Sequence, residues 1–164
     1  MLKRSYNHDC ARPLFAIMNP ELPYTLPPYQ TASGATDIMM HTMERYFTNT
    51  EHVELIDRMA EGLLVSVREA ALLAMKEPDN YNARADLMWA GSLSHNGRTG
   101  TGRVSDFASH KIEHEMGGMF DVAHGAGLCA IWGSWARYVY KVNPARFAQF
   151  AAVSYTHLTL PTIC

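Results

Sequence analysis

Two segments of the chain carry acidic and imidazole side chains at spacings that suit one metal ion. In the first, Asp37 and His41 are four residues apart. On a helix this spacing places both side chains on one face, with Cβ atoms about 5–6 Å apart. In the second, His110 and His114 repeat the same spacing. If both segments are helical, each presents a pair of candidate ligands.

A further histidine, His124, follows the second pair after a glycine pair. Gly117 and Gly118 are expected to end the second helix, so that the chain turns and returns His124 towards the same point. One carboxylate among imidazoles favours a borderline divalent ion, Fe(II) or Zn(II). Calcium and magnesium prefer oxygen ligands and fit this set poorly.

Taken alone, each part of this set can be explained by a structural role that involves no metal. An Asp-x-x-x-His pair such as Asp37 and His41 is usually the polar edge of a packed helix. A single histidine such as His124 is also consistent with a neighbour of a helix N-cap or with a core residue whose hydrogen bonds are satisfied. Two imidazoles stacked on one helix face need a reason, and the combination of all three features predicts a metal site.

An alternative motif lies within the same stretch. His110, Glu113 and His114 form the H-x-x-E-H pattern of inverted zincins, in which two histidines bind zinc and the glutamate is the general base of peptide hydrolysis. Such a site needs a distant acidic ligand, but residues 122–164 contain no Asp or Glu, and Asp121 is too close. The metallopeptidase is therefore the second hypothesis.

Both histidine segments resemble a known family. Residues 34–44 and 109–125 closely resemble the iron-containing (group III) alcohol dehydrogenases, and within them the bacterial NAD(P)H-dependent butanol and aldehyde-reducing enzymes. The resemblance runs from about residue 12 to about residue 151. It implies a mainly α structure, the helical metal-binding domain of the dehydroquinate synthase-like/iron alcohol dehydrogenase fold.

The resemblance also implies roles for the candidate residues. It assigns the metal ligands to Asp37, His41, His110 and His124. His114 matches a family histidine beside the site, so it is expected to be a catalytic, proton-handling residue and not a ligand. This corrects the pairing of His110 with His114 that spacing alone suggests.

The chemistry expected of such a site is hydride transfer between NAD(P)(H) and a primary alcohol or aldehyde. A divalent ion with a free position polarises the carbonyl as a Lewis acid, and the nicotinamide carries the hydride. His114 can move a proton at neutral pH. Glu113 and Glu115 are expected to be solvated carboxylates on the helix face, and no residue is predicted to bind the cofactor.

Composition excludes several classes of function. Net charge is −2, and the 14 basic residues are scattered, which argues against nucleic acid. No apolar run is long enough to span a membrane. Three widely spaced cysteines indicate no disulfide framework and a reducing compartment, so a cytoplasmic location is expected.

The domain organisation is expected to be that of part of an enzyme. Residues 1–24 are interpreted as the end of a nucleotide-binding domain, with an orphan buried strand at 14–18 and a proline-rich hinge at 20–28 that cannot be helical. Residues 25–152 form the helical domain, and 153–164, which lack charged residues, a non-native tail. Full-length protein is expected to be a homodimer, whereas this chain alone is expected to be a catalytically silent metal-binding unit.

Helices are predicted across most of the remaining chain. Hydrophobic periodicity, caps and breakers place them at about 31–47, 53–75, 80–95, 106–116 and 125–140, with a sixth after Asn143-Pro144. The glycine-rich stretch 97–102 is expected to be a loop and not a phosphate cradle, because no strand precedes it.

Overall fold

In the computed structural model, which describes residue 6 and residues 8–155, the chain is built of helices, and this part contains no strand. The α-helices are α1 (Pro28–Tyr46), α2 (Glu54–Lys76), α3 (Tyr81–His95), α4 (Ala108–Phe120), α5 (His124–Val139) and α6 (Pro144–Tyr155). Short 3-10 helices are η1 (Asp9–Ala11), η2 (Leu22–Thr25) and η3 (Arg98–Gly100). The predicted mainly α class is confirmed.

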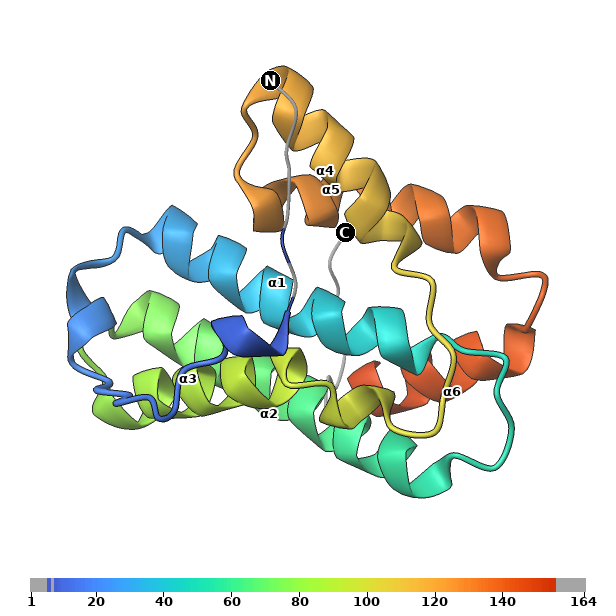
Figure 1. Ribbon diagram of the computed structural model, residues 1–164, viewed down its shortest axis with the longest axis horizontal. Coiled ribbons are helices and arrows are strands. Elements are labelled where there is room, and N and C mark those ends of the chain that lie inside the picture. Colours follow the sequence, from blue (N-terminus) through green and yellow to red (C-terminus); the bar gives the residue numbers. More distant parts are fainter. Residues whose placement is uncertain (1–5, 7, 156–164) are drawn as a thin grey trace.

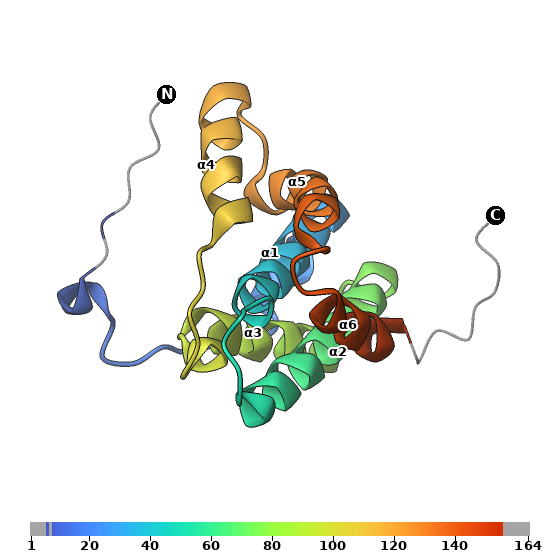
Figure 2. The same ribbon diagram turned by 90° about the vertical axis from the view of Figure 1, so that its right-hand side faces the viewer.

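Helices α1, α2 and α3 pack against one another and form the body of the fold (Figure 1). Helix α5 lies across α1, and α4 packs on α5. Figure 2 shows that α4 stands away from α2 and α6. It is joined to the other helices through its packing on α5 and through the segment between η3 and α4. Helix α1 therefore contacts α2 and α3 on one side and α5 on another, and its side chains can meet those of α4 and α5.

Small side chains allow the first three helices to approach closely. Their buried cluster contains mainly alanines, on α1, α2 and α3, together with one valine and one leucine: Ala35, Val67, Ala70, Ala74, Ala83, Leu87 and Ala90. Because alanine costs little conformational entropy in a helix and occupies little volume, this interface favours close helix packing.

A second core cluster holds α5 and α6 onto α1 and α2. Met40, Met43, Leu64 and Leu128 form its buried centre. Aromatic side chains complete it, since Phe47 contacts Trp132, Trp135, Phe147 and Phe150. This cluster anchors α5 beside the carboxyl-terminal half of α1, one to two turns beyond Asp37.

Predicted helix boundaries are close to those observed except at the proline-rich segment and at the end of α4. α1 begins at Pro28, and Leu22–Thr25 form a 3-10 helix within the stretch expected to be non-helical. The expectation was wrong because proline is disfavoured inside a helix but is well accommodated in its first turn, where its missing N–H leaves no bond unmade.

The glycine pair does not end α4, contrary to expectation. Gly117 and Gly118 lie inside the helix, which continues to Phe120. It ends at Asp121, whose φ of 55° is left-handed and whose N–H donates to the Gly117 carbonyl oxygen at 3.1 Å. Aspartate tolerates this conformation better than most residues, so the turn that returns His124 occurs later in the chain than predicted.

The predicted buried strand at residues 14–18 is wrong. These residues adopt no regular structure and are exposed, with Leu14 fully accessible. A strand needs a partner for its backbone hydrogen bonds, and no strand lies beside it in the described part of the chain. Most of the expected tail lies outside the described residues, while residues 153–155 continue α6. Among the described helices, none combines the length and apolar character needed to cross a membrane.

Candidate metal centre

Three imidazoles from three helices meet at one carboxylate oxygen. Oδ1 of Asp37 lies 3.7 Å from Nε2 of His41, 3.7 Å from Nε2 of His110 and 3.3 Å from Nε2 of His124. Helix α1 supplies Asp37 and His41, α4 supplies His110, and α5 begins at His124. The structure therefore brings together all four residues that the resemblance assigned as ligands.

The polar atoms at the centre of this cluster suit a cation. Oδ1 of Asp37 and Nε2 of His110 are buried, and neither has a hydrogen-bond partner among the described residues. Buried polar atoms are normally satisfied, so such a pair calls for an explanation. The ligand atoms of Asp37, His110 and His124 lie within 4.8 Å of one another, and those of Asp37 and His41 form a second such set with His95. Residues and donor types thus fit a borderline divalent ion.

A buried carboxylate on α1 orients His110. Oε1 of Glu44 accepts a hydrogen bond from the backbone N–H of His110 at 3.1 Å and lies 3.3 Å from its Nδ1. Because a carboxylate accepts, it holds the ring proton on Nδ1, so that Nε2 of the neutral ring presents a lone pair towards Asp37. Metal-binding histidines commonly have a partner of this kind.

His124 has an equivalent partner in Glu113, which is fully buried. Its Nδ1 forms a short hydrogen bond with Oε2 of Glu113, leaving Nε2 directed at Asp37. The expectation that Glu113 is a solvated carboxylate was wrong, whereas Glu115 is exposed as expected. The error arose because α5 covers this face of α4, and Gly127 permits the approach: a Cβ atom there would lie 2.8 Å from Cγ of Glu113.

His114 lies beside the cluster on the exposed side of α4. Its ring centroid is 5.3 Å from that of His124 and 6.3 Å from that of His110. It belongs to a candidate ligand group with Glu113 and His124 but not with Asp37. This position, next to the site and open to solvent, agrees with the expected place of His114.

Sequence reasoning missed one residue of the cluster, His95. This last residue of α3 has Nε2 at 3.2 Å from Oδ2 of Asp37, and its ring centroid is 3.8 Å from that of His41. A lone histidine at a helix end carries no periodic signal, and the contact with Asp37 spans 58 residues. Only the packing of α3 against α1 reveals it.

A strained residue packs against the imidazoles. Phe107, which precedes α4, has a left-handed φ of 54°, a conformation uncommon for a bulky side chain. Its ring centroid lies 5.7 Å from that of His41 and 5.2 Å from that of His110, and the guanidinium carbon of Arg45 lies 4.9 Å from the same centroid. The left-handed backbone thus places an apolar ring against two candidate ligands, His41 and His110.

The environment shifts the protonation of these groups. Burial raises the pKa of Asp37, but the imidazole of His110 and the hydrogen bond with His95 outweigh it, so the pKa lies well below its ordinary value. Burial and the neighbouring His95 lower the pKa of His41 to about 3. Burial also lowers the pKa of His110, but the carboxylates of Asp37 and Glu44 reverse this and raise it. Asp37 is therefore ionised at neutral pH, and His41 is neutral, with the lone pair of one ring nitrogen available to a metal.

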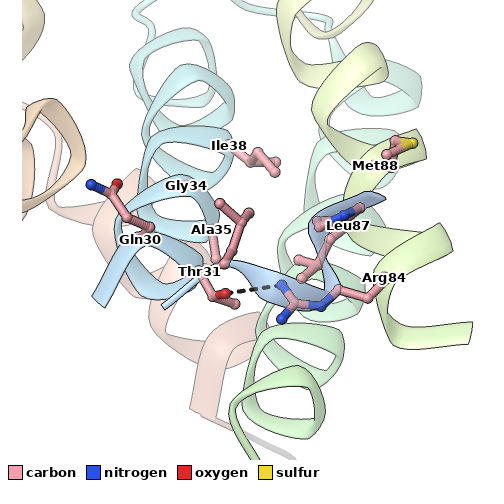
Figure 3. A pocket seen from close by; sticks show the side chains of 10 residues that line it. Gln30, Thr31, Gly34, Ala35, Ile38, Arg84, Leu87 and Met88 are labelled. Carbon is pink, nitrogen blue, oxygen red and sulfur yellow. Dashed lines mark hydrogen bonds between the residues drawn. The ribbon is translucent and has the colours of Figure 1, made fainter. Parts of the chain in front are cut away.

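A separate cavity of about 180 Å³ lies between η2, α1 and α3 (Figure 3). Its wall is mainly apolar and includes Ile38 and Leu87, and the guanidinium of Arg84 donates to Oγ1 of Thr31 at 2.9 Å at one side. None of its lining residues belongs to the imidazole cluster. It is therefore not the place where metal chemistry would occur.

Comparison with known proteins identifies the family of this chain. The profile described as "Fe-containing alcohol dehydrogenase family, C-terminal" matches residues 31–158, which include all four candidate ligands. The chain belongs to the iron-containing alcohol dehydrogenase family. Membership supports the dehydrogenase interpretation and not the inverted-zincin peptidase, and it confirms the resemblance stated from the two histidine segments.

Relatives within the family include two curated bacterial enzymes. The NADH-dependent butanol dehydrogenase B of Clostridium acetobutylicum is 42% identical over 132 residues, which cover 80% of this chain and 34% of that protein. The NADPH-dependent aldehyde reductase YqhD of Escherichia coli is 38% identical over 149 residues, covering 91% of this chain and 38% of the relative. The chain thus spans little more than a third of the length of these relatives.

Solved structures show the same arrangement of helices. The E. coli YqhD structure superposes with a TM-score of 0.89 at 33% identity, over 96% of this chain and 40% of that one. The NADH-dependent butanol dehydrogenase A of Thermotoga maritima gives a TM-score of 0.81 at 37% identity, over 83% of this chain and 34% of that one. The helical fold of the family is therefore present here.

Proposed function

We propose that Asp37, His41, His110 and His124 hold one divalent ion, Fe(II) or Zn(II). The observation that carries this proposal is the convergence of three Nε2 atoms, from three helices, on Oδ1 of Asp37. In neutral rings, these nitrogens would point lone pairs at a carboxylate oxygen, a repulsive arrangement that a cation between them resolves. Small side-chain adjustments would bring each ligand atom to about 2.0–2.3 Å from the ion.

For the whole protein, we propose a NAD(P)H-dependent alcohol dehydrogenase or aldehyde reductase that acts on primary alcohols and aldehydes. The names of the relatives from C. acetobutylicum and E. coli support this reaction class. They differ between NADH and NADPH, so both nicotinamide cofactors remain within the proposal. When bound, the divalent ion supplies a Lewis acid for the carbonyl group and the nicotinamide supplies or accepts the hydride.

The residues of this chain would prepare the site for that chemistry. Asp37 brings a single negative charge among the ligands, which leaves the centre electrophilic. Glu44 and Glu113 fix the rings of His110 and His124 in the tautomer that presents Nε2 to the centre. Preorganised ligands of this kind avoid a cost of reorganisation when the substrate binds.

We assign the proton step to His114. It lies within reach of the cluster, 5.3 Å from His124 between ring centroids, and it is exposed to solvent. Its imidazole would donate a proton to the oxygen of the aldehyde as hydride arrives at carbon, and would accept it in the reverse direction.

We also propose a cytoplasmic location and a homodimeric assembly for the full-length protein. The two described cysteines, Cys10 and Cys129, are free and exposed, which fits a reducing compartment such as the cytoplasm. Leu72 and Trp89 are exposed apolar side chains that a second copy could cover in the homodimer expected of the full-length protein.

The reaction can be tested by joining this chain to the part of E. coli YqhD that precedes the matched region. The fusion, loaded with Zn²⁺ or Fe²⁺, should oxidise NADPH in the presence of a short-chain aldehyde. Asp37→Asn should abolish turnover with loss of metal, whereas His114→Gln should lower kcat by about 10²- to 10⁴-fold with metal retained. A well-folded, metal-loaded fusion that oxidises no cofactor with any primary aldehyde would refute the proposed reaction.

A further inference from the structure

His95 contacts the candidate metal centre from α3, a helix that supplies none of the four proposed ligands. Its Nε2 lies 3.2 Å from Oδ2 of Asp37, the oxygen not shared by His41, His110 and His124. The two oxygens of Asp37 therefore face different partners. Oδ1 faces the proposed ligands, and Oδ2 faces His95.

Neighbouring groups on α3 hold the ring of His95 in this orientation. Its Nδ1 lies 2.7 Å from the hydroxyl oxygen of Ser94 and 2.9 Å from the carbonyl oxygen of Gly91. Ser94 is fully buried. The Ser94 hydroxyl can donate either to the Gly91 carbonyl oxygen, at 3.0 Å, or to Nδ1 of His95. Because a carboxylate oxygen only accepts, the 3.2 Å approach of Oδ2 of Asp37 favours the ring that carries a proton on Nε2 and donates it to Oδ2.

The rotation of the Asp37 carboxylate needs such a restraint. The terminal torsion of an aspartate is broad and has no single preferred value. A hydrogen bond to one oxygen selects the rotation in which the other oxygen points at the cluster. Packing of the His95 ring on His41, at 3.8 Å between centroids, would in addition limit the movement of that proposed ligand.

We propose that His95 is a positioning residue for the metal centre, which holds Oδ2 of Asp37 so that Oδ1 is presented to the ion. This inference rests on the proposed metal site and adds to it a residue that acts through Asp37 without coordinating. The side chain of His95 is 42% exposed, so its replacement should leave the helical fold intact.

Co²⁺ binding to the metal-free 164-residue chain tests this role. His95→Leu should weaken Co²⁺ binding by about 10- to 100-fold, the range found when an outer hydrogen-bond partner of a ligand is lost. His95→Gln, whose amide can still donate to Oδ2, should restore most of the affinity. Visible absorption of bound Co²⁺, which reports coordination number, should be the same in wild type and both variants at saturation.

A histidine outside the proposed centre, His52, provides the matched control for the loss of an imidazole. His52→Asn removes an exposed imidazole whose left-handed backbone, with φ of 60°, suits asparagine, and it should bind Co²⁺ like wild type. Equal affinity of His95→Leu and wild type would overturn the inference, and so would a changed Co²⁺ spectrum in both His95 variants, because that result makes His95 a ligand. If wild type itself binds no Co²⁺, the proposed metal site fails together with this inference.

Discussion

Gly125 of α5 lies directly against the backbone of Ser33 in α1. A Cβ atom at position 125 would be 1.9 Å from the carbonyl oxygen of Ser33, far inside van der Waals contact. His124 precedes Gly125 in the chain. The close approach of the two helices at Gly125 therefore brings Nε2 of His124 to 3.3 Å from Oδ1 of Asp37. A residue with no chemistry of its own therefore determines whether the fourth proposed ligand reaches the site.

Gly125→Ala should force α5 away from α1, because the clash is with backbone that cannot rotate aside. We expect a loss of several kcal/mol in the free energy of unfolding, at the upper end of overpacking substitutions, and loss of tight metal binding. Gly133→Ala in the same helix is the control, since no atom lies within 4 Å of its Cβ position. It should be neutral or stabilising by about 0.4–1 kcal/mol. Urea unfolding measures both, and equal stability of the two variants would contradict the proposed close contact.

Glu44→Ala should weaken both the fold and the site. It removes the acceptor for the backbone N–H and the Nδ1 of His110, both buried. An unsatisfied buried donor costs about 1–3 kcal/mol, and metal affinity should fall about 10- to 100-fold as His110 loses its orientation. Calorimetric titration with Zn²⁺ and chemical unfolding measure the two effects. Glu115→Ala, at an exposed position of α4, should change neither.

Glu113 separates the dehydrogenase from the peptidase. In the Glu113→Gln variant, the amide oxygen of the new side chain can still accept a hydrogen bond from Nδ1 of His124. This change should therefore lower metal affinity only mildly and leave aldehyde reduction by the YqhD fusion largely intact. His124→Ala should strip the metal. Hydrolysis of an unstructured protein substrate by the metal-loaded chain, abolished by Glu113→Gln, would instead establish the inverted-zincin mechanism.

Acid should destabilise the metal-free chain partly through His41. Its pKa is about 3 in the folded chain, below the ordinary value of 6.5, because burial and His95 disfavour the imidazolium. Between these values the unfolded chain binds a proton that the folded chain does not, so stability is lost as pH falls through this window. From about pH 6.5 towards about pH 4, the free energy of unfolding should therefore fall more steeply for wild type than for His41→Asn. Parallel pH profiles of the two proteins would show that His41 titrates normally.

The sequence by itself determined the helices and the residues that could bind a metal. Hydrophobic period, caps and breakers act over a few residues, so α2, α3 and α5 lie within about a residue of their predicted bounds. Asp37 with His41, and the segment from His110 to His124, are likewise local patterns, and they sufficed for the family resemblance that the profile confirmed.

Only the tertiary structure decided which side chains support those residues. Glu44 meets His110 across 66 residues, and His95 meets Asp37 across 58. Spacing along a chain says nothing about such pairs, because they depend on where helices cross and how closely they approach. Gly125 and the alanines between α1, α2 and α3 set those distances. The same packing buries Glu113, which its sequence context alone makes a surface residue, because burial is a property of the assembled helices and not of any one of them.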